Sequence, residues 1–177
     1  MRRPLAVLAS LLLALPAALN AQTAKAAPKL DDATIVAIFD GANSADIQTA
    51  GLGAEKATDP KVREIAKNFV RDHTKVRQMG RDLAAKLGVT PTPPANDHSA
   101  ADLAKTMKRL KALKGTAFDK AFLDHEIAFH QAVIDAVNTT LMPAIQNDEL
   151  KAFVASVAPA FAGHLAGAKH LREQMGS

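Results

Sequence analysis

Residues 59–88 read DPKVREIAKNFVRDHTKVRQMGRDLAAKLG, and this stretch decides the fold class. Asp59 followed by Pro60 is typical of a helix start, because Asp caps free amides and Pro fits the first turn. Apolar or small residues and one histidine then recur in steps of three and four, which places them on one helix face. They are Val62, Ala66, Phe69, His73, Val76, Gly80, Leu83 and Leu87. Gly88 is typical of a helix end, so we predict an amphipathic helix over residues 60–87.

The same period recurs over residues 31–57, 117–140 and 148–175, with a shorter amphipathic segment after Ser99. Strand alternation is absent from the sequence. The pattern predicts an all-α fold over residues 31–175, an antiparallel four-helix bundle with an extra short helix between its second and third helices. Residues 88–116 are long enough to cross the length of the bundle, as in ferritin-like topologies, which favours that connection over an up-down-up-down order.

Several local signals mark the ends of the other helices. Asp31 and residues 147–149 are suitable starts for the first and fourth, and Thr116 with Asp119 resembles a capping box for the third. Pro143 should end the third helix. Pro159 should kink the fourth helix or move its start toward residue 158.

The N-terminus has the order of a secretory signal peptide. Two arginines precede an apolar run over residues 5–19, and small residues follow. We predict a leader over residues 1–21, with cleavage as late as residue 26, and a flexible lead-in over residues 22–30. An uncleaved inner-membrane anchor is the less favoured alternative, because the run is shorter than the ~20 residues of a spanning helix. The expected location is the periplasm, without stable membrane insertion after cleavage.

Composition excludes several classes of function. The chain has no cysteine, which excludes disulfides, thiolate metal sites and lipidation at cysteine. Its net charge is +4, and loss of Arg2 and Arg3 with the leader leaves 20 basic against 18 acidic residues. That small excess argues against nucleic-acid binding. Catalytic motifs and an organic cofactor are not expected, because glycine-rich phosphate loops and nucleophile-elbow motifs are absent from the sequence.

Each long helix carries one ionisable residue on its apolar face: Asp46, His73, His130 and His164. All four lie within about 2.5 residues of their helix midpoints, or ~4 Å along the axis. Antiparallel helices of similar length share a mid-plane, so one carboxylate and three imidazoles could meet there. Such a set suits one zinc, copper or iron ion in a closed site.

Two interpretations of this layer stay open: a metal centre, and a hydrogen-bonded polar layer that sets helix register. In the first, Asp72, Glu126 and His125 would orient the ligands through hydrogen bonds. His125 and His130 are five residues apart, so they do not form the zinc-protease motif. The Glu-x-x-His motif of di-iron bundles is also missing.

The chain resembles a bacterial family called domain of unknown function 4142, often labelled as outer membrane proteins. The matching pieces are residues 40–51, Phe69-Val70-Arg71-Asp72-His73, Phe118-Asp119 followed by His130, and residues 159–165. The resemblance implies export and a ferritin-like bundle, without an established activity. This chain has Asp46 where the family usually has Glu, and Phe122 where it usually has Tyr.

Three functions follow from these patterns. The first is a periplasmic metal-binding protein. The alternative is a non-enzymatic module for envelope stress or for binding a protein partner or a second copy, whose His/Asp layer is purely structural. A third is a carrier of an apolar ligand, held against the glycine- and alanine-rich face of the first helix.

Overall fold

The computed structural model describes residues 30–176, so the predicted leader and residues 22–29 of the lead-in lie outside the described residues. Within that range the chain consists of helices and their connections and contains no strand. The prediction of an all-α fold is therefore confirmed.

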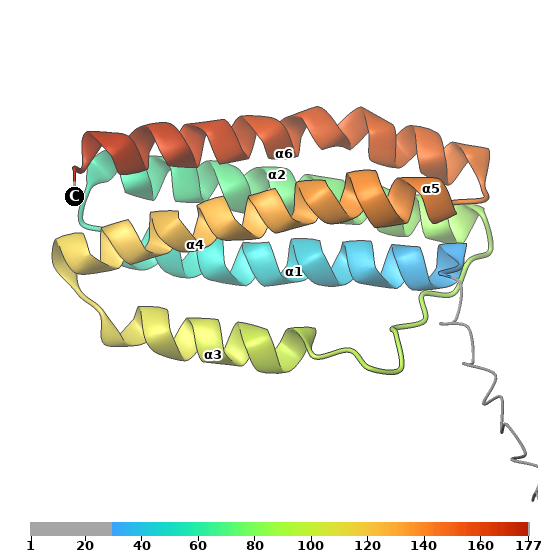
Figure 1. The fold of residues 1–177 in the computed structure, drawn as a ribbon, viewed down its shortest axis with the longest axis horizontal. Helices are drawn as coiled ribbons and strands as arrows, with labels where there is room; N and C mark the ends of the chain where they lie inside the picture. Colours follow the sequence, from blue (N-terminus) through green and yellow to red (C-terminus); the bar gives the residue numbers. More distant parts are fainter. Residues whose placement is uncertain (1–29, 177) are drawn as a thin grey trace, which may run out of the picture.

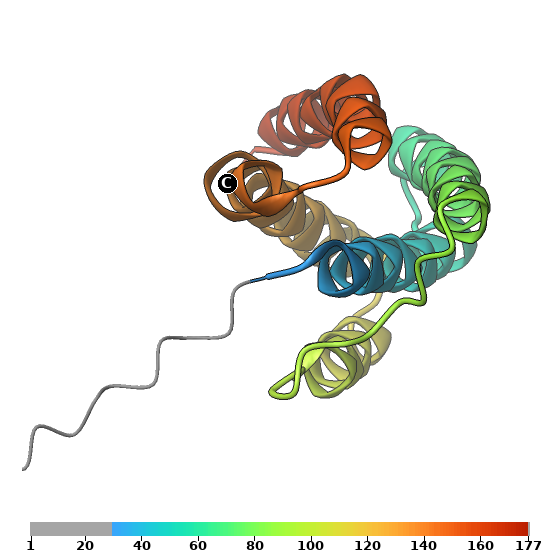
Figure 2. The same cartoon turned by 90° about the vertical axis from the view of Figure 1, so that its right-hand side faces the viewer.

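Four long helices lie side by side: α1 (Asp32–Lys56), α2 (Pro60–Lys86), α4 (Gly115–Ala136) and α6 (Asp148–Gln174). Figure 1 shows α1 and α6 running in one direction and α2 and α4 in the other. The connection from α2 to α4 crosses the length of the assembly, as its length favoured. It contains α3 (Ser99–Ala112), which lies on the outer side of α1 (Figure 2).

The predicted starts of three long helices are confirmed by side-chain caps. The Asp31 carboxylate accepts a hydrogen bond from the Thr34 amide at 2.8 Å, and Asp59 accepts from the Lys61 amide at 2.7 Å. Asn147 Oδ1 accepts from the Leu150 amide at 3.0 Å. These bonds satisfy amides that have no partner within the helix.

Asp119 has a different role from the predicted one. α4 begins at Gly115 without a side-chain cap, so the predicted capping box is wrong. The Asp119 side chain is buried and turned toward the connection between α1 and α2. It accepts hydrogen bonds from the amides of Thr58 and Asp59, both at 2.9 Å, and from the Thr58 hydroxyl at 2.5 Å. Asp119 thus links the connection between α1 and α2 to α4.

The two prolines affect their helices differently. α6 is continuous through Pro159, so the predicted shift of its start is wrong. Before Pro143 the chain forms a π-helical turn, η1 (Val137–Leu141), and then continues as α5 (Met142–Ala144). A wider turn accommodates the missing amide and the ring of proline, which would collide with the carbonyl four residues earlier in an α-helix.

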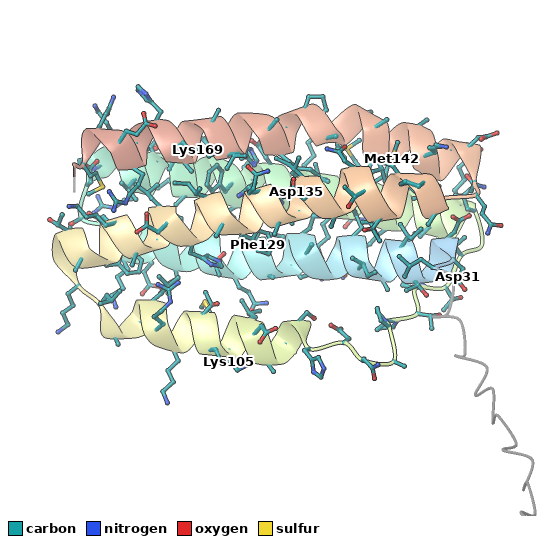
Figure 3. The ribbon with its side chains drawn as sticks, in the orientation of Figure 1. Asp31, Lys105, Phe129, Asp135, Met142 and Lys169 are labelled. Atoms are coloured by element: carbon teal, nitrogen blue, oxygen red, sulfur yellow. The ribbon has the colours of Figure 1, made fainter. Side chains whose placement is uncertain are left out.

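The core between the helices has apolar ends and a polar middle. Figure 3 shows the side chains that fill this space. One end is centred on Phe69, Phe118 and Phe122, and the other on Ile35, Leu141 and residues around them. Between these ends lie the buried polar residues Asn43, Asp46, Thr49, His73, Glu126 and His130. The fold therefore concentrates its buried polar groups at one level.

Close packing of α1 depends on one of its three glycines. A Cβ atom on Gly53 would lie 2.6 Å from the Phe122 ring and 3.0 Å from the Cβ atom of Ala66. A Cβ atom on Gly41 or Gly51 would meet nothing within 4 Å. A close approach to α1 thus occurs at Gly53, where the absence of a side chain leaves room for the Phe122 ring.

Within the described residues, one helix is long and apolar enough to cross a membrane by length and composition. It is α6, and only 28% of its most apolar window is buried. The core helix of a water-soluble protein meets the same criteria. This helix therefore does not distinguish an anchored protein from a released one.

Candidate metal centre

The structure brings together the four residues that the sequence singled out. Asp46 comes from α1, His73 from α2, His130 from α4 and His164 from α6. Asp46, His73 and His130 are buried, and the His164 side chain is 12% exposed. One side chain from each long helix therefore reaches a shared central position.

The ring nitrogens of the three histidines converge on His73. Its Nε2 atom lies 3.3 Å from Nε2 of His130 and 3.2 Å from Nδ1 of His164. The Asp46 Oδ2 atom lies 3.5 Å from the same His73 nitrogen and 3.6 Å from the His130 nitrogen. Four potential ligand atoms are thus gathered around one point.

Two histidines have ring protons that are turned away from this point. The Asn43 amide donates through Nδ2 to the Phe39 carbonyl, so its Oδ1 atom can only accept from Nδ1 of His73, at 2.9 Å. Nδ1 of His130 lies 2.9 Å from the Glu126 backbone carbonyl, which also can only accept. A neutral imidazole carries one proton. Both Nε2 atoms therefore present lone pairs to each other.

His164 is oriented in the same way by a carboxylate. Its Nε2 atom lies 3.1 Å from Oδ2 of Asp72, and Oδ1 of the same carboxylate accepts from Arg71 Nε at 2.9 Å. Although burial opposes the ionised form, the hydrogen bonds from Arg71 and His164 hold the pKa of Asp72 below its usual range. Asp72 is thus an acceptor, Nε2 of His164 is the donor, and Nδ1 presents the third lone pair.

These separations match the requirements of a small metal ion. In a tetrahedral site with bonds of 2.0–2.1 Å, neighbouring ligand atoms lie about 3.3–3.4 Å apart. The four separations given above range from 3.2 to 3.6 Å. Hydrogen bonds from the outer ring nitrogens to an amide, a carbonyl and a carboxylate are also typical of metal-binding histidines. The His/Asp cluster could therefore hold a metal ion.

Two carboxyl groups in this layer have no hydrogen-bond partner among the described residues. All four side-chain oxygens of Asp46 and Glu126 are in this state, and both side chains are fully buried. Burial raises the pKa of Asp46 to about 7. Burial and the neighbouring Asp46 raise the pKa of Glu126 well above its usual value. Unpartnered buried carboxyl groups are rare because burial without a partner is costly.

The same environment keeps the histidines uncharged. Burial, reinforced by the charges of His130 and His164, lowers the pKa of His73 to about 3. Burial lowers the pKa of His130 to about 4, and it also lowers the pKa of His164. All three rings are therefore neutral at pH 7, which is the form that binds a metal.

Sequence reasoning missed Asn43 and gave Glu126 too small a part. Steps of three and four from Phe39 reach both Ala42 and Asn43, and Asn43 is the buried residue. Asn43 lies three residues before Asp46, about one helical turn, and this spacing could have predicted that both side chains lie on the same face of the helix. Glu126 was expected only to support the ligands, yet its carboxyl lies within the layer itself.

His125 does not take the expected supporting role. It lines a cavity of about 500 Å³ between α1, α3 and α4, together with Phe129, which is labelled in Figure 3. The same cavity is lined by small residues of α1, including Ala37, Gly41 and Ala45. The small-residue face of α1 thus does leave a hollow, while His125 belongs to that hollow and not to the metal cluster.

Comparison with known proteins identifies the family but not an activity. The family described as Domain of unknown function (DUF4142) matches residues 17–171. That range includes the four residues of the cluster and the groups that orient them. Neither a curated protein nor a solved structure matches the chain. The chain belongs to the DUF4142 family.

Proposed function

We propose that this protein binds one transition-metal ion through His73, His130, His164 and Asp46. The observation that carries the proposal is that Nε2 of His73 lies 3.3 Å from Nε2 of His130 and 3.2 Å from Nδ1 of His164, with a lone pair on each of the three nitrogens. Like dipoles at that distance repel unless a cation lies between them. Three histidines with one carboxylate suit zinc, copper or iron.

In the alternative, a purely structural polar layer, the only protons left for the facing ring nitrogens are those of Asp46 and Glu126, whose pKa values burial raises. A hydrogen-bonded layer needs a proton between each pair of facing acceptors. Here the protons of the three rings are used by Asn43, the Glu126 carbonyl and Asp72. The Asp46 carboxylate receives no hydrogen bond from any described residue. A metal ion satisfies all of these acceptors at once.

We also propose that the protein acts after export, in the periplasm. The support is the order of basic, apolar and small residues in the first 26 positions. Because all candidate ligands come from His and Asp, the site does not depend on the redox state of thiols in that compartment. A holding or storage role fits four protein ligands better than catalysis, which needs an open coordination position.

The test is the metal content of the untagged protein. We expect one ion per chain, together with a higher melting temperature when Zn²⁺ or Cu²⁺ is added and a lower one with chelator. At a free metal concentration of 100 times Kd the stabilisation is about 2.7 kcal/mol. His73→Ala and His164→Ala should abolish both effects.

His170→Ala is the matched control, because His170 lies on the same helix as His164 but is exposed and bonded to Gln174. It should bind metal like the unchanged protein. An unchanged protein without metal, whose melting is the same with zinc, copper or chelator, would show the proposal to be wrong.

A further inference from the structure

Glu126 is the buried acid that the four-residue site leaves unexplained. It lies on α4 one turn before His130, and its side chain is completely buried. Neither of its carboxyl oxygens has a hydrogen-bond partner among the described residues. One ligand atom from each of Asp46, Glu126 and His130 lies within 4.8 Å of the other two. The Oε2 atom of Glu126 lies 3.6 Å from Nδ1 of His130, so Glu126 adjoins the cluster on the side of Asp46 and His130.

The charges of the groups around Glu126 indicate its role. Each of the three imidazoles has one nitrogen bonded to an outer acceptor, and burial opposes a second proton on the ring. Asp72 is partly exposed and already paired with Arg71 at 2.9 Å. No lysine or arginine forms an ion pair with Asp46 or Glu126 among the described residues. The buried layer thus contains two carboxyl groups and no protein cation to balance them.

A divalent ion balances this layer and a monovalent ion does not. When a divalent ion binds and both carboxyl groups release their protons, the layer has a net charge of zero. A monovalent ion compensates only one carboxylate, so the second carboxyl must keep its proton or remain as an uncompensated buried charge, and it adds nothing to the binding of that ion. Carboxylate oxygens are also poor ligands for soft monovalent ions such as Cu⁺ and Ag⁺, which prefer sulfur.

We propose that Glu126 is the second carboxylate of the metal centre, and that Asp46 and Glu126 together make the site selective for divalent over monovalent metal ions. This inference rests on the proposed function, because it requires that the cluster binds a metal. Glu126 is on this basis a specificity-determining residue, whether its oxygen contacts the ion or faces Asp46.

The experiment compares the binding of Zn²⁺ and Ag⁺ to the full chain, each alone and in competition, by isothermal titration. Ag⁺ serves as a monovalent probe that is not oxidised or reduced under these conditions. The unchanged protein should bind Zn²⁺ and retain it against an equal concentration of Ag⁺. Glu126→Gln, which keeps the shape and removes the charge, should weaken Zn²⁺ binding by about 10–100-fold without weakening Ag⁺ binding.

Glu149→Gln is the matched control, because Glu149 is exposed on α6 and pairs with Lys86. It should leave both affinities unchanged. A preference of the unchanged protein for Ag⁺ would overturn the inference, and this measurement does not depend on the folding of any variant. Equal Zn²⁺ affinity in folded Glu126→Gln and the unchanged protein would also overturn it. Failure to bind either ion would instead contradict the proposed function itself.

Discussion

Nδ1 of His73 lies 2.9 Å from Oδ1 of Asn43, and this hydrogen bond decides which nitrogen of His73 faces the other two histidines. Without it, the ring proton could move to Nε2, where it would occupy the position that a metal needs. Asn43 therefore orients His73 within the candidate metal centre without being one of the proposed ligands.

Asn43→Ala should lower the affinity for Zn²⁺ by about 10–100-fold, because the His73 ring loses its fixed orientation and tautomer. Competition with a chromophoric chelator measures this change. Asn68→Ala is the control, since Asn68 only accepts a hydrogen bond from the exposed Arg71. Equal affinities in the two variants would mean that Asn43 has no part in the site.

The stability of the metal-free protein should fall as pH rises above about 6.5. The pKa of Asp46 rises from 3.8 to about 7 on folding, so the folded state holds a proton that the unfolded state has lost between those values. This contribution to stability falls as pH rises from about 4 to about 7, and Glu126 acts in the same direction. The pKa values of His73 and His130 fall from 6.5 to about 3 and 4. Their contribution is therefore lost as pH drops below about 6.5.

Calorimetry in the presence of chelator, between pH 5 and pH 9, measures this profile. Asp46→Asn should gain stability with rising pH, relative to the unchanged protein, between pH 5 and about pH 7, because the variant lacks the group that ionises first in the unfolded state. Asp124→Asn, at an exposed pair with Arg172, should leave the profile unchanged. Continued stabilisation of the metal-free protein from pH 7 to pH 8 would contradict the assignment.

Gly53→Ala should destabilise the protein by about 1–3 kcal/mol, because the added methyl would enter the space of the Phe122 ring. Gly51→Ala, two residues earlier in the same helix, should stabilise it by about 0.5–1 kcal/mol, since alanine favours a helix and meets no neighbour. Urea unfolding of both variants measures whether each substitution lowers or raises the free energy of unfolding. Equal changes in the free energy of unfolding would show that a Cβ atom at position 53 does not collide with the Phe122 ring.

Asp119→Ala should lower the free energy of unfolding by about 3 kcal/mol, because it leaves the amides of Thr58 and Asp59 without their acceptor. The measurement is again urea unfolding. Asp124→Ala removes an acid from the same helix at an exposed position, and its effect should stay within about 0.5 kcal/mol. An Asp119 variant as stable as this control would exclude the proposed joining role.

The sequence by itself determined the helices and the level of the site. Steps of three and four place side chains on one face of a helix, and Asp31, Asp59 and Asn147 mark where helices begin through bonds to nearby amides. These are local relationships, so they can be read along the chain. Because Asp46, His73, His130 and His164 lie near their helix midpoints, their common level could also be predicted.

Only the tertiary structure decided how each helix is rotated and which atoms meet. Helix rotation buries Asn43 in place of Ala42 and puts Glu126 inside the layer, because packing against neighbouring helices selects the buried face. Asp119 resembles a local cap in sequence, yet it binds residues about 60 positions away. The tautomers of the three histidines depend on acceptors brought by folding, and these acceptors turn four suitably spaced residues into a candidate metal centre.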